Sequence, residues 1–416
     1  MAEAFLELFL VQVFIIFLLA KLSGLAMRRL GQPSVLGEIA VGIILGNLVI
    51  GRYDIAELLQ IGSEHGGEAL SALAHLGIIL LLFIIGMHIT LGDLKKVGKV
   101  SISVGVVGMV LPFLFGVSVI LSLGAGEPRA AMFVGVALMA TSVGVTARLC
   151  QDLKRENSRE TVIVMGAAVM DDVLGLVALS IAVGIASGSV NPGTIMMTVG
   201  VATAFVMIML LFGERIVDWA GGAKVLEDRI VFLVRKDKLT KLGQENGPII
   251  IALAVCFGMA ALASLFGLAA IVGAFLAGMA FADVNEHYGL TKRIEPVEFF
   301  LVPFFFVLIG VEVDISLIYA WDSIILITLL FALAMTGKVL AGLIGAWKEG
   351  RASAILIGLG MAPRGEVMII VAQVGLDLGV LSESLFGALV VVSMLTILAV
   401  PPLFKSTCTY QDKCAL

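Results

Sequence analysis

The segment Gly166-Ala-Ala-Val-Met-Asp-Asp-Val-Leu-Gly175 places two adjacent carboxylates, Asp171 and Asp172, inside an apolar run over residues 161–187. A helix of this length crosses ~30 Å of hydrocarbon, and an ionisable side chain near the bilayer centre costs ~2.5–3.5 kcal/mol on insertion scales. The pair therefore indicates a functional site rather than a helix cap. Consecutive helical positions point ~100° apart, so one carboxylate can face a protein partner while the other faces an aqueous cavity.

The whole chain has the composition of a membrane protein. Of its 416 residues, 60% are hydrophobic and 14% are charged, and the mean hydropathy is +1.11. This balance excludes a water-soluble domain, whose surface would be largely apolar. We predict an all-α polytopic protein with thirteen spans, at 4–26, 33–51, 72–90, 101–123, 129–149, 161–187, 193–217, 247–265, 267–284, 297–313, 322–347, 352–374 and 379–404.

The distribution of basic residues predicts the orientation of these spans. If the first loop is cytoplasmic, 22 of the 27 Lys and Arg residues fall in cytoplasmic segments and two, Arg52 and Arg129, fall outside. The other three, Lys21, Lys338 and Arg364, lie inside spans. By the positive-inside rule, the N-terminus is expected outside and the C-terminus in the cytoplasm.

Two glycine-containing motifs recur in the same order in both halves of the chain. The segment 36–42 (LGEIAVG) resembles 272–278 (VGAFLAG), and 82–90 (LFIIGMHIT) resembles 306–314 (FVLIGVEVD), at offsets of 236 and 224 residues. Spans 1–6 and 8–13 would then be two six-helix repeats, inverted in the membrane because span 7 links them by a single crossing. Inverted repeats with a binding site near the midplane are typical of secondary transporters.

Other charges also lie deep in predicted spans. Lys338 is too deep to reach either surface easily, so it needs a buried counter-ion, for which Asp171 and Asp172 are the candidates. Arg364 and Glu366 follow Pro363, which predicts a broken helix in span 352–374. The corresponding span 129–149 has no proline, so a break is less strongly indicated there. Glu38 fits either a local hydrogen bond or a role in a cavity.

The combination of four motifs resembles the monovalent cation:proton antiporter-2 family, in the sodium/proton exchanger superfamily. These motifs are Gly-Gln-Pro-Ser-Val-Leu-Gly-Glu at 31–38, the Asp-Asp pair, Gly337-Lys338, and Pro-Arg-Gly-Glu at 363–366. The likeness covers nearly the whole chain. It implies that Asp172 carries the transported ion and that Asp171 pairs with Lys338.

The resemblance also implies roles for four other residues. Thr141 and Ser142 would lie at the crossover of two unwound spans, and Arg364 with Glu366 would be a polar pair supporting the core. Transported Na+ would bind Asp172, with Asp171, Thr141 or Ser142 as candidate further ligands. No other cofactor and no nucleic acid is expected.

A domain plan follows from the same resemblance. Segments 1–90 and 247–320 would form a dimerisation domain of a homodimer, and 91–190 with 321–404 a core that moves against it like an elevator. Residues 191–246 would hold the linking helix and a cytoplasmic connection, and 405–416 a short cytoplasmic tail. The expected location is the prokaryotic inner (plasma) membrane, in contact with the lipid bilayer, with a role in pH homeostasis.

The Asp-Asp pair bears on the choice of activity. Gated potassium-efflux relatives usually carry Gln-Asp and a large regulatory domain, so the pair favours electrogenic Na+/H+ exchange, with Li+ or K+ as other cations. The alternatives are a K+/H+ antiporter or a gated K+ efflux protein of the same fold. An intramembrane aspartyl protease needs two aspartates facing each other from different helices, whereas these are neighbours, so the chain is not expected to be an enzyme.

Overall fold

The computed structural model describes a helical protein whose only strands, within the described residues, are the two-residue β1 (Val49–Ile50) and β2 (Tyr53–Asp54). The structure describes residues 2–50, 53–54, 66–186, 193, 196–197, 200, 203–208, 239–266, 268–282, 285, 288–311 and 321–415. Its helices are α1 (Ala2–Arg29), α2 (Ser34–Asn47), α4 (Gly66–Met87), α5 (Leu91–Leu123), α6 (Pro128–Met139), α7 (Val143–Asp152), α8 (Arg159–Ala186), α11 (Leu239–Leu265), α12 (Ala270–Ala280), α14 (Leu290–Val311), α15 (Trp321–Gly345), the 3-10 helix η2 (Trp347–Glu349), α16 (Arg351–Gly360), α17 (Glu366–Asp377) and α18 (Glu383–Ala415).

The helices have the length and composition of membrane spans. Among the described residues, nine candidate spans are long and apolar enough to cross a bilayer, and shorter apolar helices accompany them. Large apolar side chains lie exposed along several of them, as expected where lipid rather than water is the solvent. The predicted all-helical membrane fold is therefore confirmed. The count of thirteen spans stays a prediction, because most of span 193–217 lies outside the described residues.

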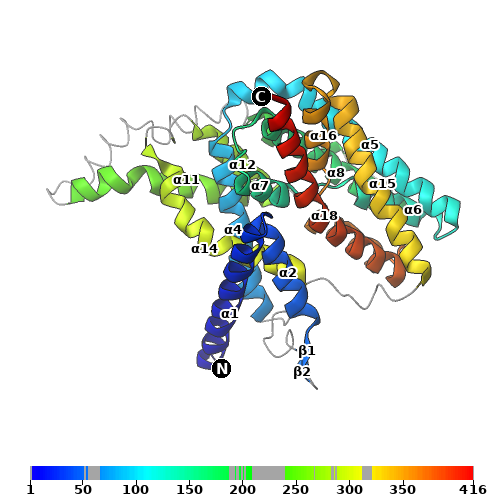
Figure 1. Cartoon of the computed structure of the whole chain (residues 1–416), viewed down its shortest axis with the longest axis horizontal. Coiled ribbons are helices and arrows are strands. Elements are labelled where there is room, and N and C mark those ends of the chain that lie inside the picture. Colours follow the sequence, from blue (N-terminus) through cyan, green and yellow to red (C-terminus); the bar gives the residue numbers. More distant parts are fainter. Residues whose placement is uncertain are drawn as a thin grey trace.

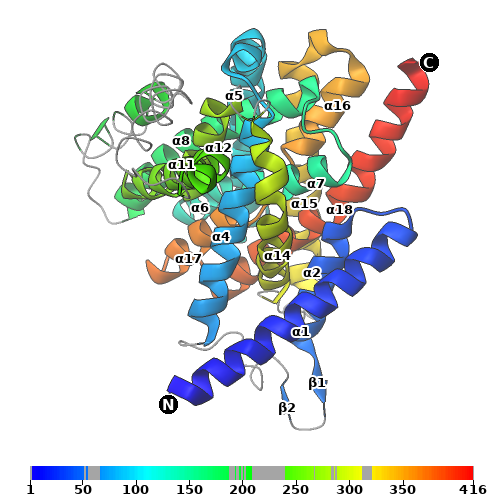
Figure 2. The same ribbon diagram turned by 90° about the vertical axis from the view of Figure 1, so that its left-hand side faces the viewer.

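The helices pack in two groups (Figures 1 and 2). In the first, which we call the α4 group, α4 contacts α12 and α14, α2 contacts α1 and α14, and α11 contacts α12. In the second, the α5 group, α5 contacts α6, α8 and α15, while α16, α17 and α18 complete the bundle. Helix α7 continues the chain from α6 and contacts α8, but it also contacts α2 and α4. Helix α7 therefore lies between the two groups and contacts both.

Two glycine crossings hold the α4 group together. A Cβ added at Gly42 of α2 would lie 2.8 Å from Gly310 Cα of α14, and one added at Gly86 of α4 would lie 3.0 Å from Gly278 Cα of α12. Only glycine permits these close approaches. Gly42 and Gly278 end the two copies of the first repeated motif, and Gly86 and Gly310 are the matching glycines of the second. Each crossing thus joins the first predicted repeat to the second, and the repeat relates the two crossings to each other.

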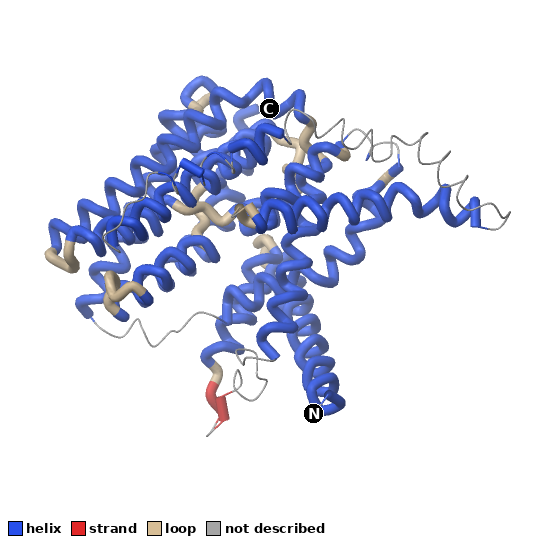
Figure 3. Tube along the Cα trace, turned by 180° about the vertical axis from the view of Figure 1, so that it is seen from behind, coloured by secondary structure: helices blue, strands red, loops and turns tan. Residues whose placement is uncertain are grey.

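Two predicted spans are divided into half-helices, and the loops that interrupt helices are tan in Figure 3. Span 352–374 is divided into α16 and α17, as its proline predicts. Span 129–149 is divided as clearly, into α6 and α7, although it lacks a proline. This break, less strongly indicated by the sequence, is stabilised by a distant segment: Ser142 N donates to Pro363 O at 2.8 Å.

Some helix ends also differ from the predicted spans. Helix α5 begins at Leu91, ten residues before the predicted span, because the Thr90 side chain caps it by accepting from Asp93 N. Helix α18 runs past two prolines to Ala415. The predicted short tail at 405–416 is thus helical over its described residues.

Candidate functional site

The site is built where the two broken spans cross. The break between α6 and α7 meets the break between α16 and α17 through the Ser142–Pro363 hydrogen bond. Thr146 Oγ1 adds a second link, donating to Gly360 O at 2.6 Å. Gly365 has no side chain to obstruct this approach, since an added Cβ would lie 2.6 Å from Ser142 Oγ. Four half-helix ends are therefore brought to one place, where the α5 group meets the start of α7.

Arg364 neutralises the carbonyl ends of these half-helices. Its side chain is completely buried, and Nη1 donates to Ala140 O, just past the end of α6, at 2.6 Å. A longer contact of 3.5 Å reaches Met361 O at the end of α16. A helix C-terminus carries a partial negative charge, so the guanidinium offsets two such ends. Its own backbone is held by α18, where Thr396 Oγ1 accepts from Arg364 N at 3.0 Å.

Asp171 and Lys338 form a buried ion pair beside the crossing. Lys338 Nζ lies 2.7 Å from Asp171 Oδ2, and the two side chains are 0% and 3% exposed. Thr141 Oγ1 donates to the same carboxylate oxygen at 2.5 Å. The pair joins α8 to α15, and Thr141 joins both to the α6–α7 break. Of the two candidate counter-ions for Lys338, the structure therefore selects Asp171.

Asp172 occupies a different environment from its neighbour. It is half-buried, whereas Asp171 is only 5% exposed as a residue. Asp171 Oδ1 and Ser142 Oγ are buried and make no hydrogen bond within the described part of the chain. Carboxylate and hydroxyl oxygens are hard donors suited to alkali cations. The crossing thus offers buried oxygens on Asp171 and Ser142, and the half-buried Asp172 is the next residue of α8.

The predicted site residues are not all brought together. Asp171, Lys338 and Thr141 make direct contacts, and Ser142 and Arg364 lie in the crossing itself. The side chain of Glu366, the predicted partner of Arg364, lies outside the described residues. Glu38 is in neither cavity nor crossing, because it belongs to a separate buried cluster with Arg148.

That cluster also contains Glu298 and Asp152, which the sequence does not single out. Arg148 lies at the end of the predicted span 129–149, where basic residues are ordinary. Glu298 lies at the start of the predicted span 297–313. A charge at a span end gives no signal of its own, and the cluster becomes visible only when three elements are packed together.

A helical membrane fold with a buried ion pair and several oxygens at crossing half-helices defines the class of the protein as a membrane transporter rather than an enzyme. The chain belongs to the sodium/hydrogen exchanger family, whose transmembrane region matches residues 14–406.

Characterised relatives are similar over nearly their full length. The chain is 34% identical to the Na(+)/H(+)-K(+) antiporter GerN of Bacillus cereus, over 97% of both proteins. It is 30% identical to the high-affinity Na(+)/H(+) antiporter NhaS3 of Synechocystis, covering 95% of this chain and 89% of that one. The solved structure of the sodium proton antiporter MjNhaP1 from Methanocaldococcus jannaschii aligns over 97% of both chains with a TM-score of 0.63. At 16% identity, this match supports the fold alone.

Proposed function

We propose that the protein exchanges Na+ for H+ across the membrane, with Li+ and K+ as alternative cations, by elevator-like alternating access. The observation that carries the proposal is the buried Lys338–Asp171 pair, 2.7 Å long, beside the crossing of two broken helices, with the half-buried Asp172 next to Asp171 on α8. The names of the relatives, Na(+)/H(+) and Na(+)/H(+)-K(+) antiporters, agree with this class of substrate.

The chemistry of one cycle follows from the charges of three side chains. In the proton-loaded site Asp172 is protonated, and Asp171 is neutralised by the Lys338 ammonium, so the trio carries no net charge. When Na+ binds between the two carboxylates, Asp172 releases its proton and Lys338 loses its counter-ion. An isolated buried ammonium is costly, so Lys338 releases a second proton. The sodium-loaded site, with Na+, two carboxylates and a neutral lysine, then carries one net negative charge, whereas the proton-loaded site carries none.

Two properties follow from this charge balance. Each loaded site carries less net charge than the empty site, in which two carboxylates and a neutral Lys338 leave two negative charges, so the empty site crosses an apolar barrier least easily; this enforces exchange. Two protons move against one Na+, so each cycle transfers one net charge and transport is electrogenic. The Asp-Asp pair is essential to this stoichiometry, because Asp171 is both the partner of Lys338 and a ligand of the cation.

The two helix groups suggest how the site moves. The residues of the crossing lie in the α5 group and at the start of α7, which together are assigned as the moving core; the α4 group is assigned as the dimerisation domain of a homodimer. The glycine crossings of the α4 group support a rigid unit. We place the protein in the prokaryotic inner membrane, with the N-terminus outside and the C-terminus in the cytoplasm, on the basis of the basic-residue asymmetry.

The test is cation-dependent proton flux in proteoliposomes of purified protein. Addition of Na+ should collapse a preformed pH gradient in a saturable manner, and Asp172→Asn should reduce the rate to the level of empty liposomes. Full exchange by Asp172→Asn would refute the site assignment. If K+ but not Na+ drives proton flux, the substrate is K+ rather than Na+. Cation flux without proton movement would favour the gated efflux alternative.

A further inference from the structure

Arg148 forms a buried charge cluster between the two helix groups. It lies on α7, and its guanidinium contacts Glu298 Oε1 of α14 at 3.1 Å and Glu38 Oε1 of α2 at 3.3 Å. The three residues are 5%, 3% and 1% exposed, respectively. Both acceptors belong to the α4 group, whereas Arg148 is joined through α7 to the ion site. The cluster therefore connects the proposed core to the proposed dimerisation domain.

A second contact between the groups lies one helical turn further along α7. The Asp152 carboxylate accepts hydrogen bonds from Ser34 Oγ at 2.7 and 2.8 Å and from Val35 N at 3.2 Å. Arg28 Nη2 lies 3.3 Å away. Because Ser34 and Val35 begin α2, the carboxylate of Asp152, far away in sequence, stabilises the N-terminus of that helix. The end of α7 is thus held to the start of α2.

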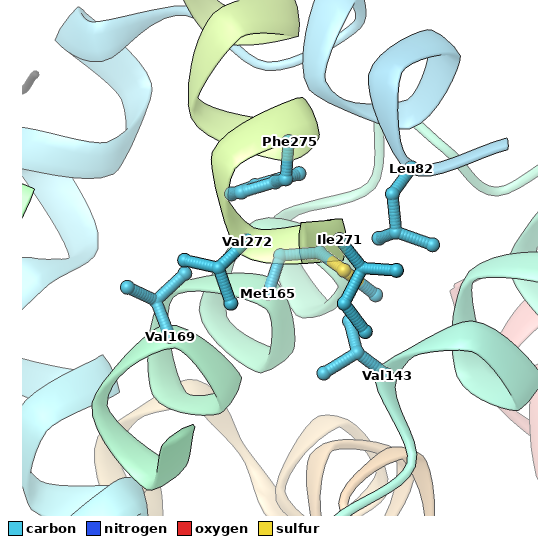
Figure 4. Close-up of a pocket in the computed structure, with 7 residues that line it drawn as sticks. All are labelled: Leu82, Val143, Met165, Val169, Ile271, Val272 and Phe275. Atoms are coloured by element: carbon cyan, nitrogen blue, oxygen red, sulfur yellow. The ribbon is translucent and has the colours of Figure 1, made fainter. Parts of the chain in front are cut away.

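An apolar seam lies between the same groups next to the ion site (Figure 4). Val143 of α7 and Met165 and Val169 of α8 face Leu82 of α4 and Phe275 of α12. The cavity between them is only about 10 Å³, at the lower limit for holding one water molecule. Met165 and Val169 lie between the start of α8 and Asp172. The seam and the Arg148 cluster are therefore on the same side of the ion site, the side at which α8 begins.

We propose that Arg148 is an interdomain latch, which closes the cytoplasmic path to the ion site when bound to Glu38 and Glu298 and must release them in every transport cycle. The inference rests on the proposed alternating access and orientation. Helix α7 has only ten residues, with the break at one end and Arg148 and Asp152 near the other. Movement of the site past the α4 group therefore separates these contacts. Once separated, the two carboxylates line the cytoplasmic entrance used by the cation.

An ionic contact suits a latch better than an apolar one. A buried ion pair adds little net stability because desolvation offsets its attraction, yet it fixes one docking position. A more exposed ion pair within one group serves for comparison: Arg159 of α8 binds Glu349 of η2 at 2.6 Å, and η2 contacts α15 and α16 of the α5 group. Breaking that pair leaves the arrangement of the two groups unchanged.

Chemical labelling tests the latch without measuring transport. In a protein whose four cysteines are replaced by serine, a Val143→Cys reporter is exposed to a membrane-impermeant maleimide in inside-out vesicles. Arg148→Gln and the double variant Glu38→Gln/Glu298→Gln should label about tenfold faster or more than the parent, since truncating one partner of a buried charge pair costs at least that factor. Arg159→Gln should label at the parent rate. Equal rates in Arg148→Gln and the parent would overturn the latch.

A cross-link tests the same separation with Arg148 intact. Ser34→Cys/Asp152→Cys should form a disulfide under mild oxidation, stop cation-driven proton flux and recover on reduction. The control pair Glu160→Cys/Ser353→Cys replaces a 2.6 Å contact between α8 and α16, both in the α5 group, and should transport when oxidised. Undiminished flux through the cross-linked Ser34–Asp152 variant would overturn the proposal, even where Arg148→Gln does not fold. Absence of flux in the parent would instead refute the proposed function, and labelling would still decide the latch.

Discussion

Replacing Lys338 by methionine should destabilise the protein strongly, because it leaves the Asp171 carboxylate buried without its counter-ion. The substitution conserves length and removes one contact of 2.7 Å between side chains that are 0% and 3% exposed. Removing one partner of a buried ion pair costs ~3–5 kcal/mol. At ~2 °C per kcal/mol, the lower end of the range for domains of 150–250 residues, the midpoint of thermal unfolding should fall by about 6–10 °C.

The assay is thermal unfolding of detergent-purified variants followed by tryptophan fluorescence. Lys99→Met, at an exposed lysine of α5, serves as the control and should lie within about 1 °C of the parent. The double variant Asp171→Asn/Lys338→Met has no unpaired charge and should recover a large part of the lost stability. A Lys338→Met midpoint equal to that of the parent, or a double variant less stable than the single one, would refute this reasoning.

Three other predictions concern separate contacts. Thr141→Val removes the hydroxyl that donates to Asp171 at 2.5 Å, so it should lower the unfolding free energy by ~1.5–3 kcal/mol and slow exchange. Thr141→Ser keeps the hydroxyl and should retain the stability and the exchange rate of the parent. Equal behaviour of the two variants in unfolding and flux assays would disprove the contact. Gly86→Ala should lower the thermal midpoint, because the new Cβ would lie 3.0 Å from Gly278 Cα of α12 and such overpacking costs ~1–3 kcal/mol. The control Gly258→Ala should not lower it in this way, since nothing lies within 4 Å of a Cβ added there. The hydrogen bond from Arg159 lowers the pKa of Glu349 below its usual 4.5, so this pair stabilises the fold at neutral pH and stops doing so as the pH falls through that lowered pKa. Glu349→Gln should therefore be less stable than the parent by up to ~1 kcal/mol at pH 7 and equal to it in strong acid. A difference in unfolding free energy that does not change with pH would contradict the assignment.

The parts of the fold that the sequence predicts are those dictated by the bilayer. Apolar runs must be helices there because no other open structure satisfies the backbone, and a deep lysine must have a deep acidic partner. These arguments place Asp171, Asp172 and Lys338 in one site. The repeated glycines are explained by packing: Gly42 and Gly86 have counterparts in the second repeat because two helices approach closely at each.

What the sequence does not predict depends on contacts between distant segments. The break at Thr141 and Ser142 needs no proline, since the Ser142 backbone N–H that it frees donates to Pro363 O of another span. The family resemblance implies the pairing of Asp171 with Lys338, but residue spacing alone leaves open which aspartate is the partner, because that depends on how α8 is rotated against α15. Arg148 becomes informative only when α7 is seen against α2 and α14.

The central claim is that protons and the cation compete for the Asp171–Asp172 site. The most direct measurement is the Na+ dependence of the initial exchange rate in proteoliposomes at a series of pH values. Competition predicts that the Na+ concentration for half-maximal rate rises as the pH falls, while the rate at saturating Na+ stays the same. A half-saturating concentration independent of pH, with only the maximal rate changing, would contradict the claim.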